Sequence, residues 1–270
     1  MAYKSVFKKI ENALKIDLVV GERKLTAFVK ERVKKSGVKG VVLGLSGGVD
    51  SSVAATICAN AIGPRNVLGI SMPEAKITSP NDVNHARRIA NDLDIDFRLV
   101  DITPVVNKIF HGISDYKADE VLSSANTRPR IRMCIVYYYA NLLNRLVIGS
   151  GNRSELRTGY FTKYGDGAVD LLPLGSLYKT QVIKLARYLK LPREIIEKTP
   201  TAGLWNGQTD EKELGIRYKK LDMIFAGLDL GLKAPIIAET ININLKKVES
   251  FIDREHKISH KLRSPDIPKR

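Results

Sequence analysis

The sequence is poor in the features that mark secreted and membrane proteins. Its 270 residues include two cysteines, and no apolar run approaches the roughly 20 residues of a membrane span. The first residues, Met1 to Ser5, lack the apolar core of a signal peptide. Cys58 and Cys134 both fall in apolar helical patterns, which predicts two reduced thiols in the core rather than a disulfide. We therefore expect a cytoplasmic protein with no membrane segment.

The sequence is also short of histidine and of acidic residues. The four histidines show no zinc-ligand spacing with one another or with the cysteines, which argues against a zinc site. Asp and Glu number 29 against 44 Lys and Arg, a net charge of +15. Such a surface suits either a polyanionic small substrate or a nucleic acid. Because the lysines are scattered along the chain and form no block, we expect a small anionic substrate and keep nucleic acid as the rival.

Apolar residues are numerous enough for one good core. They make up 44% of the chain, an ordinary share for a globular protein. A chain of this length supports one large domain or one domain with a small appendage. We predict a single domain over 1–270, with amphipathic helices over 1–39, an α/β core over 40–205 and a helical tail over 206–270.

Short apolar strands alternate with helical patterns through the middle of the chain. The predicted strands cover 40–43, 66–72, 97–102 and 145–150. The helical patterns between them cover 53–62, 79–93, 103–110 and 127–143. This alternation predicts an α/β fold with a doubly wound parallel sheet flanked by helices. In such a sheet, ligands bind beyond the carboxyl ends of the strands.

The remainder of the chain contains one polar segment and a helical tail. Residues 151–178 are rich in Gly, Tyr, Thr, Asp and Lys without a helical period, and long loops of this kind are usually functional. From Asp210 the pattern is helical, broken at Gly227 and Pro235, with a last helix over 245–260.

The most informative stretch joins the first predicted strand to the first helix. It reads Gly44-Leu45-Ser46-Gly47-Gly48-Val49-Asp50-Ser51. The glycine pair lets backbone N–H groups approach an anion, and the helix N-terminus adds a positive partial charge. The stretch is neither the G-x-x-x-x-G-K-[ST] loop nor G-x-G-x-x-G. A carboxylate at Asp50 would repel phosphates unless a cation intervened, so its presence predicts bound Mg²⁺.

Ser-Gly-Gly-x-Asp-Ser after a strand resembles the signature of the PP-loop ATP pyrophosphatases, which split ATP between its α- and β-phosphates. The resemblance implies a Rossmann-like fold of the adenine nucleotide alpha hydrolase type and an adenylating activity. It leaves several acceptor substrates open.

Further blocks, in order along the chain, resemble the NAD synthetase family and extend the match over about 41–261. They are 130–133, 149–156, 159–168, 177–182, 200–205, 208–211 and 260–261. The resemblance implies ATP-dependent amidation of deamido-NAD (nicotinate adenine dinucleotide) to NAD by a ligase that forms a carbon–nitrogen bond. ATP activates the nicotinate carboxylate as an NAD-adenylate with release of pyrophosphate, and ammonia then displaces AMP.

By this resemblance, ATP contacts the phosphate loop and three residues elsewhere. The implied ATP-binding set is Gly44, Leu45, Ser46, Gly47, Gly48, Val49, Asp50, Ser51, Ser150, Lys179 and Thr201. Ser150 stands where the family has a threonine and keeps the hydroxyl group. Asp50 and Glu155 are the implied Mg²⁺ ligands, expected at adjacent strand ends, and Lys179 is implied to contact an ATP phosphate.

The resemblance places the deamido-NAD site at Arg130, Lys163, Asp170, His260 and Lys261. We expect Arg130 to cap the long helix over 127–143, which we predict to begin at Thr127, at the end that faces a phosphate-bearing ligand. The charges of Arg130, Lys163 and Lys261 also give the positive excess a local use, because deamido-NAD carries a pyrophosphate and a carboxylate.

The implied catalytic residues are Asp50, Lys163 and Lys179, to which we add Asp166 as a separate hypothesis. Ammonium must lose a proton before it attacks, and a loop carboxylate near the acyl-adenylate could hold it. Gly165 and Gly167 on either side suggest a loop that closes over the intermediate and excludes water.

The resemblance also leads to expectations about the nitrogen donor and the oligomeric state. Residues 1–39 contain no cysteine and are too few for a glutaminase domain, so we expect free ammonia as donor unless a separate subunit delivers it. The family is homodimeric, and apolar stripes on the N-terminal and long helices could form the interface. Two alternatives remain: a tRNA-modifying PP-loop enzyme, suggested by the charge, and a nucleotide-binding module without catalysis.

Overall fold

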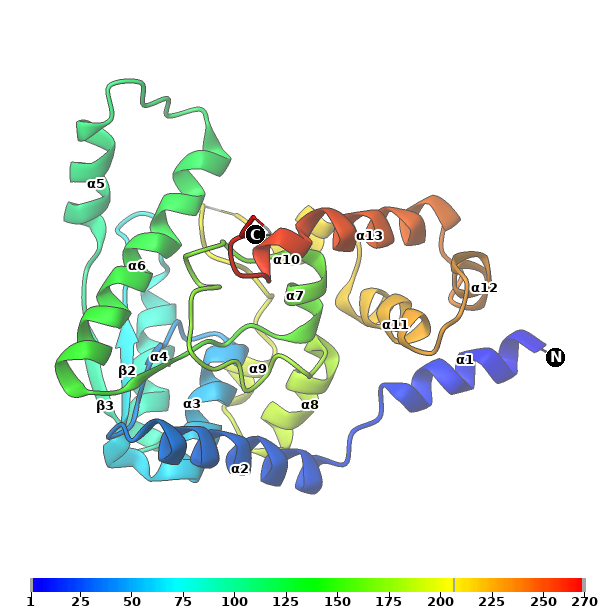
Figure 1. Cartoon of the computed structure of the whole chain (residues 1–270), viewed down its shortest axis with the longest axis horizontal. Coiled ribbons are helices and arrows are strands. Elements are labelled where there is room, and N and C mark those ends of the chain that lie inside the picture. Colours follow the sequence, from blue (N-terminus) through cyan, green and yellow to red (C-terminus); the bar gives the residue numbers. More distant parts are fainter. Residues whose placement is uncertain (1, 206, 269–270) are drawn as a thin grey trace.

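Four parallel strands form the sheet around which the chain folds. The computed structural model describes residues 2–205 and 207–268. The strands pair in the order β3-β2-β1-β4, with bounds Asp96–Leu99, Val67–Ser71, Val41–Gly44 and Leu146–Ile148. In the central strand, Val42 lies opposite Leu68 of β2 and Val147 of β4. The arrangement confirms the predicted parallel α/β sheet (Figure 1).

Helices cover both faces of the sheet, which is why its central strands are apolar on both sides. Side chains alternate along β1: Val41 and Leu43 belong to one apolar cluster and Val42 to the other. The first face packs against α2 (Leu18–Ser36), α3 (Val49–Ile62), α4 (Pro80–Asp92), α8 (Lys179–Tyr188) and α9 (Arg193–Ile196). The second packs against α5 (Thr103–Gly112) and α6 (Val121–Leu143).

The helix after the phosphate loop, α3, is buried on almost every side. Its residues include four alanines and one cysteine, small side chains that let it approach the sheet closely. It also packs against α2 and α8, and only Asn60 is exposed. This burial accounts for its many small apolar side chains, and its N-terminus lies at the carboxyl end of β1.

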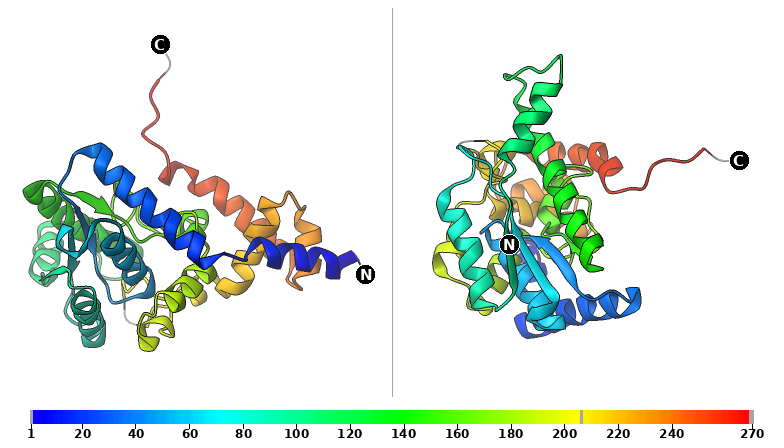
Figure 2. Two further views of the ribbon diagram at one scale, coloured as in Figure 1. Left: turned by 90° about the horizontal axis from the view of Figure 1, so that it is seen from below. Right: turned by 90° about the vertical axis from the view of Figure 1, so that its left-hand side faces the viewer.

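A second layer of helices lies beside the sheet domain (Figures 1 and 2). It has its own apolar cluster, built from α11 (Tyr218–Asp229), α12 (Ala234–Thr240) and α13 (Leu245–Ile258), with α10 (Asp210–Leu214) at its edge. The first helix, α1 (Ala2–Ala13), packs on this layer through Ile10, as does Leu14 directly after it, whereas α2 packs on the sheet. The two helices of residues 1–39 therefore stabilise different layers.

The long helix starts earlier than its sequence pattern suggests. We expected it to begin at Thr127, but α6 begins at Val121 and carries Pro129 in its interior. Proline removes one helical hydrogen bond, at a cost of about 3 kcal/mol. Here its ring is buried and packs against Gly165 of the following loop, and apolar contacts along the rest of α6 offset that cost. Arg130 consequently lies well inside the helix, and the expectation that it caps the helix is wrong.

Two smaller expectations are also wrong. The segment 151–178 is not helix-free, because Asn152 opens a short helix, α7 (Arg153–Thr158), with a capping box. The tail is not broken at Gly227, which lies inside α11. The break expected at Pro235 is confirmed, because α11 ends at Asp229 and α12 begins at Ala234 with Pro235 in its first turn.

The two cysteines are free but differ in environment. Cys58 is buried in α3, where desolvation raises the pKa of its thiol to about 12. Cys134 is exposed on α6, so the prediction of two core thiols holds for Cys58 and is wrong for Cys134. Among the described residues, 2–205 and 207–268, no helix combines the length and the apolar character that crossing a membrane requires.

Gly227 provides a test of the helical layer. A Cβ atom at this position would lie 2.9 Å from Cγ1 of the fully buried Ile237 of α12. We expect Gly227→Ala to destabilise the protein by about 1–3 kcal/mol through overpacking. Gly112→Ala is the matched control, because Gly112 also lies in a helix and a Cβ there meets nothing within 4 Å.

The measurement is the free energy of unfolding in urea. The control should be neutral or stabilising by up to about 1 kcal/mol, since alanine restricts the unfolded chain. Equal effects of the two substitutions would contradict the close approach of α11 and α12.

Candidate active site

The phosphate loop adopts a tight turn between β1 and α3. The Ser46 amide donates to Ser51 Oγ at 3.2 Å, and the two serine hydroxyls lie 3.0 Å apart. The Ser51 and Ser52 hydroxyls both donate to the Gly48 carbonyl, at 3.1 and 2.8 Å. These bonds turn the serine side chains back onto the loop. The N–H groups of the first turn of α3, which have no intrahelical acceptors, remain available to an anion.

Gly47 is the residue of this loop that nothing else could replace. Its φ is +76°, in the left-handed region, and a Cβ would lie 2.2 Å from the Asp82 carbonyl oxygen. The loop therefore lies directly against the first turn of α4. Glycine at this position is a steric requirement that is independent of any ligand.

Lys179 joins the two carboxylates that were predicted to bind metal. Its Nζ donates to Asp50 Oδ2 and lies 3.7 Å from Glu155 Oε1. Asp50 comes from the first turn of α3 and Glu155 from the first turn of α7, and these helices follow the neighbouring strands β1 and β4. Lys179 is the first residue of α8 and is only 3% exposed. The structure thus brings these three residues together at one edge of the sheet.

Asn152 holds the two carboxylates relative to each other. Its Nδ2 donates to Asp50 Oδ1 at 2.9 Å, and its Oδ1 accepts the Glu155 amide at 3.1 Å. Its own amide donates to Glu155 Oε2 at 3.1 Å. Asn152 is fully buried. We did not single it out from the sequence, although Asn-x-x-Glu after a strand is a recognisable capping box.

The electrostatics of this group favour an additional cation. Burial, and secondarily the charge of Asp50, raises the pKa of the Glu155 carboxyl to about 8. Burial lowers the pKa of Lys179, but Asp50 and Glu155 outweigh that effect and raise it above its usual value. The ammonium stays charged, and ionisation of Glu155 in this buried place beside Asp50 is costly unless a further cation accompanies it.

A third carboxylate, Asp210, lies behind the same lysine. Its Oδ2 accepts the hydroxyl of Tyr218 at 3.0 Å, and its Oδ1 is buried with no hydrogen-bond partner among the described residues. Burial raises the pKa of Asp210, and the charge of Lys179 opposes that shift. The Tyr218 ring centroid lies 5.4 Å from Lys179 Nζ, within cation–π range. Asp210 was part of a matched sequence block, but its type and position alone did not mark it as a site residue.

The two remaining ATP candidates lie on loops. Ser150 is half-buried directly after β4, at the edge where Asp50 and Glu155 meet. Thr201 is exposed in the connection between α9 and α10, and its Oγ1 accepts the Gly203 amide at 3.1 Å. Because β4 pairs in parallel with β1, Ser150 lies near the end of β1 where the phosphate loop starts. Within residues 2–205 and 207–268, Thr201 makes no side-chain hydrogen bond to that loop.

Three of the predicted deamido-NAD residues gather around the loop after α7. Arg130 Nε and Nη2 both donate to the Lys163 carbonyl, at 3.3 Å. Lys261 Nζ donates to the carbonyls of Gly159 and Phe161 at 2.8 and 2.9 Å. Burial lowers the pKa of Lys261, and so does the charge of Arg130 nearby. The result is a basic group contributed by α6, the loop and the C-terminal segment.

The other two candidates are placed differently. Asp170 is engaged with the protein itself, because its Oδ2 accepts the Val147 amide at 2.7 Å and its Oδ1 accepts the Tyr137 hydroxyl at 3.3 Å. His260 is exposed on the short 3-10 helix Ser259–Lys261 that follows α13. Neither contacts the basic group through a hydrogen bond in the part of the chain that the structure describes.

Asp166 closes its own loop. Its Oδ1 accepts the Thr162 amide at 2.8 Å, and Thr162 Oγ1 donates to Asn126 of α6 at 2.8 Å. Although solvent reaches the side chain, the protein around it desolvates the carboxyl group and raises its pKa. Lys261 and Arg132 are close enough for charge interaction with Asp166. The carboxylate therefore lies beside the basic group.

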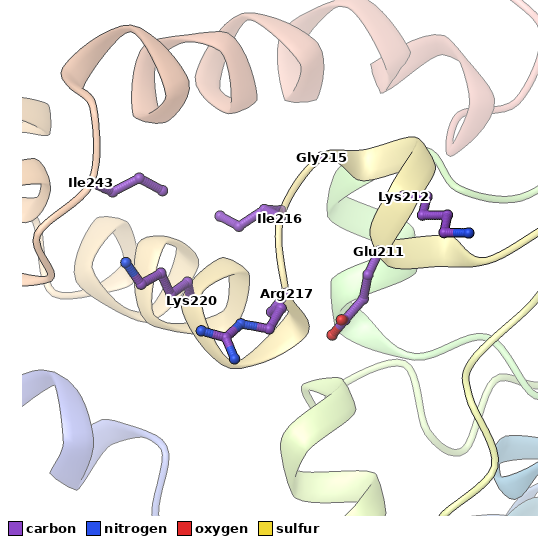
Figure 3. A pocket seen from close by; sticks show the side chains of 7 residues that line it. All are labelled: Glu211, Lys212, Gly215, Ile216, Arg217, Lys220 and Ile243. Carbon is purple, nitrogen blue, oxygen red and sulfur yellow. The ribbon is translucent and has the colours of Figure 1, made fainter.

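An open depression of about 460 Å³ lies elsewhere, between the start of α11 and the α12–α13 connection (Figure 3). Its charged groups stabilise local backbone: Glu211 accepts the Tyr218 amide at 3.0 Å, and Lys220 donates to the Asn242 carbonyl at 2.9 Å. None of the predicted site residues lines it. We therefore assign the candidate active site to the edge of the sheet rather than to this depression.

Comparison with known proteins identifies the family of the chain. A family model described as NAD synthase matches residues 22–265. The NH(3)-dependent NAD(+) synthetase of Methanosarcina mazei is 40% identical, over 94% of this chain and 99% of the relative. Two solved structures, each 31% identical and covering 94% of this chain, are similar in fold. They are an NMN synthetase from Francisella tularensis (TM-score 0.83, 99% of its chain) and an NH3-dependent NAD synthetase from Campylobacter jejuni (TM-score 0.79, 100% of its chain). The chain belongs to the NAD synthase family.

Proposed function

We propose that the chain converts deamido-NAD to NAD, with ATP and free ammonia as co-substrates. As a member of the NAD synthase family it is a ligase that forms a carbon–nitrogen bond. The observation that carries the proposal is the junction of Asp50, Lys179 and Glu155 beside a loop built to accept phosphates. The specific choice of ammonia is supported by relatives named as NH(3)-dependent, one of which this chain covers over 99% of its length.

In the first step, the nicotinate carboxylate attacks the α-phosphorus of ATP and pyrophosphate leaves. The N-terminus of α3 and the loop amides bind the phosphates, and Ser46, Ser51 and Ser150 offer hydroxyl groups. Lys179 stabilises negative charge that develops on the transferred group. Because its ammonium already lies between two carboxylates, it is held in place before ATP arrives.

Mg²⁺ fits the residues at this edge. Mg²⁺ is usually bound through one or two carboxylates together with substrate phosphates rather than by a full protein cage. Asp50 and Glu155 supply two carboxylates, and the described residues contain no group of three metal-binding side chains. Burial, and secondarily the charge of Asp50, raises the pKa of Glu155, and a bound divalent cation would favour its ionised form. When bound, the ion would neutralise the phosphate charge that otherwise repels the attacking carboxylate.

In the second step, ammonia displaces AMP from the adenylate. Arg130, Lys163 and Lys261 form a basic surface suited to the pyrophosphate of deamido-NAD. Asp166, beside this surface, holds the ammonium and takes its proton. Its raised pKa, caused by the protein around it, brings the carboxyl closer to the operating pH of a base. Asp170 and His260 remain proposed contacts to deamido-NAD.

The proposed assembly is a homodimer in the cytoplasm. Tyr138 and Leu142 lie one turn apart on α6 and are 63% and 62% exposed, large apolar side chains on one helical face. A self-complementary contact of two such faces would bury them. The free thiol of Cys58 supports a reducing compartment.

The function is tested by following pyrophosphate release from ATP. Addition of deamido-NAD should trigger release, and addition of ammonia should then produce NAD and AMP. Release that instead requires nicotinate mononucleotide would assign the activity named for the Francisella structure. Dependence on tRNA, or no release with any acceptor, would contradict the proposal.

The metal site is tested at Glu155. We expect Glu155→Gln to raise the Mg²⁺ concentration for half-maximal pyrophosphate release by about tenfold or more, because one charged ligand is lost. Asp50→Asn should lower the maximal rate by about 10²–10³-fold, since it also frees Lys179. Glu31→Gln, on the exposed face of α2, is the control and should leave both quantities unchanged. An unchanged Mg²⁺ requirement in Glu155→Gln would exclude Glu155 as a ligand.

The role of Asp166 is tested by separating the two steps. Asp166→Asn keeps an oxygen that can accept the Thr162 amide, so the loop should keep its shape. We expect pyrophosphate release at the normal rate and amide formation slowed by about 10²-fold or more. Asp253→Asn serves as the control, because Asp253 is an exposed residue of α13. If both steps slow equally, Asp166 has no separate role in the ammonia step.

A further inference from the structure

Two residues of α11 contact Lys179 or the start of its helix, and neither belongs to the predicted site. Tyr218 and Asp222 are four residues apart, so they lie on the same face of α11. The helix belongs to the second layer, outside the sheet domain. Its contact with Lys179 therefore links the C-terminal helices to the edge of the sheet where the phosphate loop lies.

Asp222 is fully buried, with both carboxylate oxygens engaged. Its Oδ2 accepts the Thr180 amide at 2.9 Å, and its Oδ1 accepts the hydroxyl of Ser154 at 2.5 Å. Ser154 Oγ in turn accepts the Lys179 amide at 2.9 Å. Asp222 thus satisfies the first two amides of α8, one directly and the other through Ser154.

These bonds determine where α8 begins. The first amides of a helix have no intrahelical acceptors, and a carboxylate there also interacts favourably with the helix dipole. Because Lys179 and Thr180 are the first two residues of α8, the carboxylate holds the backbone from which the Lys179 side chain extends. Ser154 lies next to Glu155 on α7, so the same bonds also hold the helix that carries the second metal ligand.

Tyr218 acts on the other end of the lysine. Its ring centroid is 5.4 Å from Lys179 Nζ, and its hydroxyl is held by Asp210 at 3.0 Å. One face of α11 therefore lies against the ammonium of Lys179 and, through Asp222, holds the backbone beside it, at Thr180 directly and at Lys179 through Ser154.

Another acidic residue of α11, Asp229, has a structural role only. Its side chain is half-exposed, and it accepts hydrogen bonds from Arg153, Arg157 and Tyr178, with distances of 2.5–3.0 Å. It thus joins α11 to the same two elements, α7 and the start of α8, without contacting Lys179, Thr180 or Ser154. Substitutions of Asp229 and Asp222 can therefore distinguish two effects. Asp229 only joins α11 to α7 and the start of α8, whereas Asp222 also holds the backbone at Lys179 and Thr180.

We propose that Asp222 is a positioning residue that, through Ser154 and the first amides of α8, sets Lys179 for phosphoryl chemistry at the α-phosphate of ATP. This role rests on the proposed function, because it assigns Lys179 to the adenylation step. In this role Asp222 contacts no substrate and acts only through the first turn of α8. The Tyr218 ring limits where the Lys179 ammonium can lie.

The test compares Asp222→Asn and Ser154→Ala with the matched control Asp229→Asn. In each purified full-length variant, acetylation of Lys179 by an N-hydroxysuccinimide ester is measured by mass spectrometry without substrates. Circular dichroism melting confirms folding. We expect Lys179 labelling to rise about tenfold in the first two variants, because loss of a hydrogen bond to a buried charge loosens the ion pair. The control should label as the wild type does.

The same variants are assayed for pyrophosphate release. We expect kcat to fall about tenfold in Asp222→Asn and Ser154→Ala while the KM for ATP changes less than about threefold. Unchanged labelling and kcat in folded Ser154→Ala would overturn the proposal, even if Asp222→Asn fails to fold. Equal effects in Asp229→Asn would also overturn it, because they would reflect general docking. Since labelling needs no substrate, it stays informative if deamido-NAD proves not to be the acceptor.

Discussion

The ion pair between Lys179 and Asp50 is the interaction on which the candidate active site depends. A buried ammonium is costly unless charged partners accompany it, and Lys179 is 3% exposed. Its partners come from two helices that follow neighbouring strands, and its amide donates to Ser154, whose hydroxyl donates to Asp222 of α11 in the second layer. Loss of Asp50 would leave the buried ammonium without its hydrogen-bonded carboxylate. The C-terminal helices therefore meet the edge of the sheet at this charged group, in addition to the contacts that Asp229 makes.

This arrangement gives the two chemical steps separate surroundings. Carboxylates and one lysine gather at the carboxyl ends of β1 and β4, where phosphates can approach the N-terminus of α3. Arginine and lysine side chains gather around the loop after α7, which is tied to α6 and to the C-terminal segment. The first group suits the triphosphate with its metal ion, and the second suits an anionic acceptor. Asp166 adjoins the second group, where we propose that ammonia reacts.

The parts of the structure that could be predicted from sequence are those governed by local patterns. The alternation of apolar strands and helices predicts the parallel sheet, and the glycine pair before Asp50 predicts the turn at its edge. Predictions failed where packing overrides a local preference. Pro129 lies inside α6 because its ring is buried against Gly165, and Gly227 continues α11 because a glycine permits the close approach of Ile237. Cys134 lies in an apolar pattern and is nevertheless exposed.

The sequence by itself determined the type of sheet, the phosphate-binding turn and the family, because these depend on residues that are close together in the chain or recur in a recognisable order. The tertiary structure alone decided which side chains hold the charged group. Asn152, Asp210 and Asp222 lie at distant positions and carry no local mark of function beyond a helix cap. They meet Asp50 or Lys179, or the start of its helix, because the carboxyl ends of neighbouring parallel strands converge and α11 packs across them. Contacts between residues so far apart depend on how the sheet and the helical layer pack together. The spacing of residues along the chain does not specify that packing.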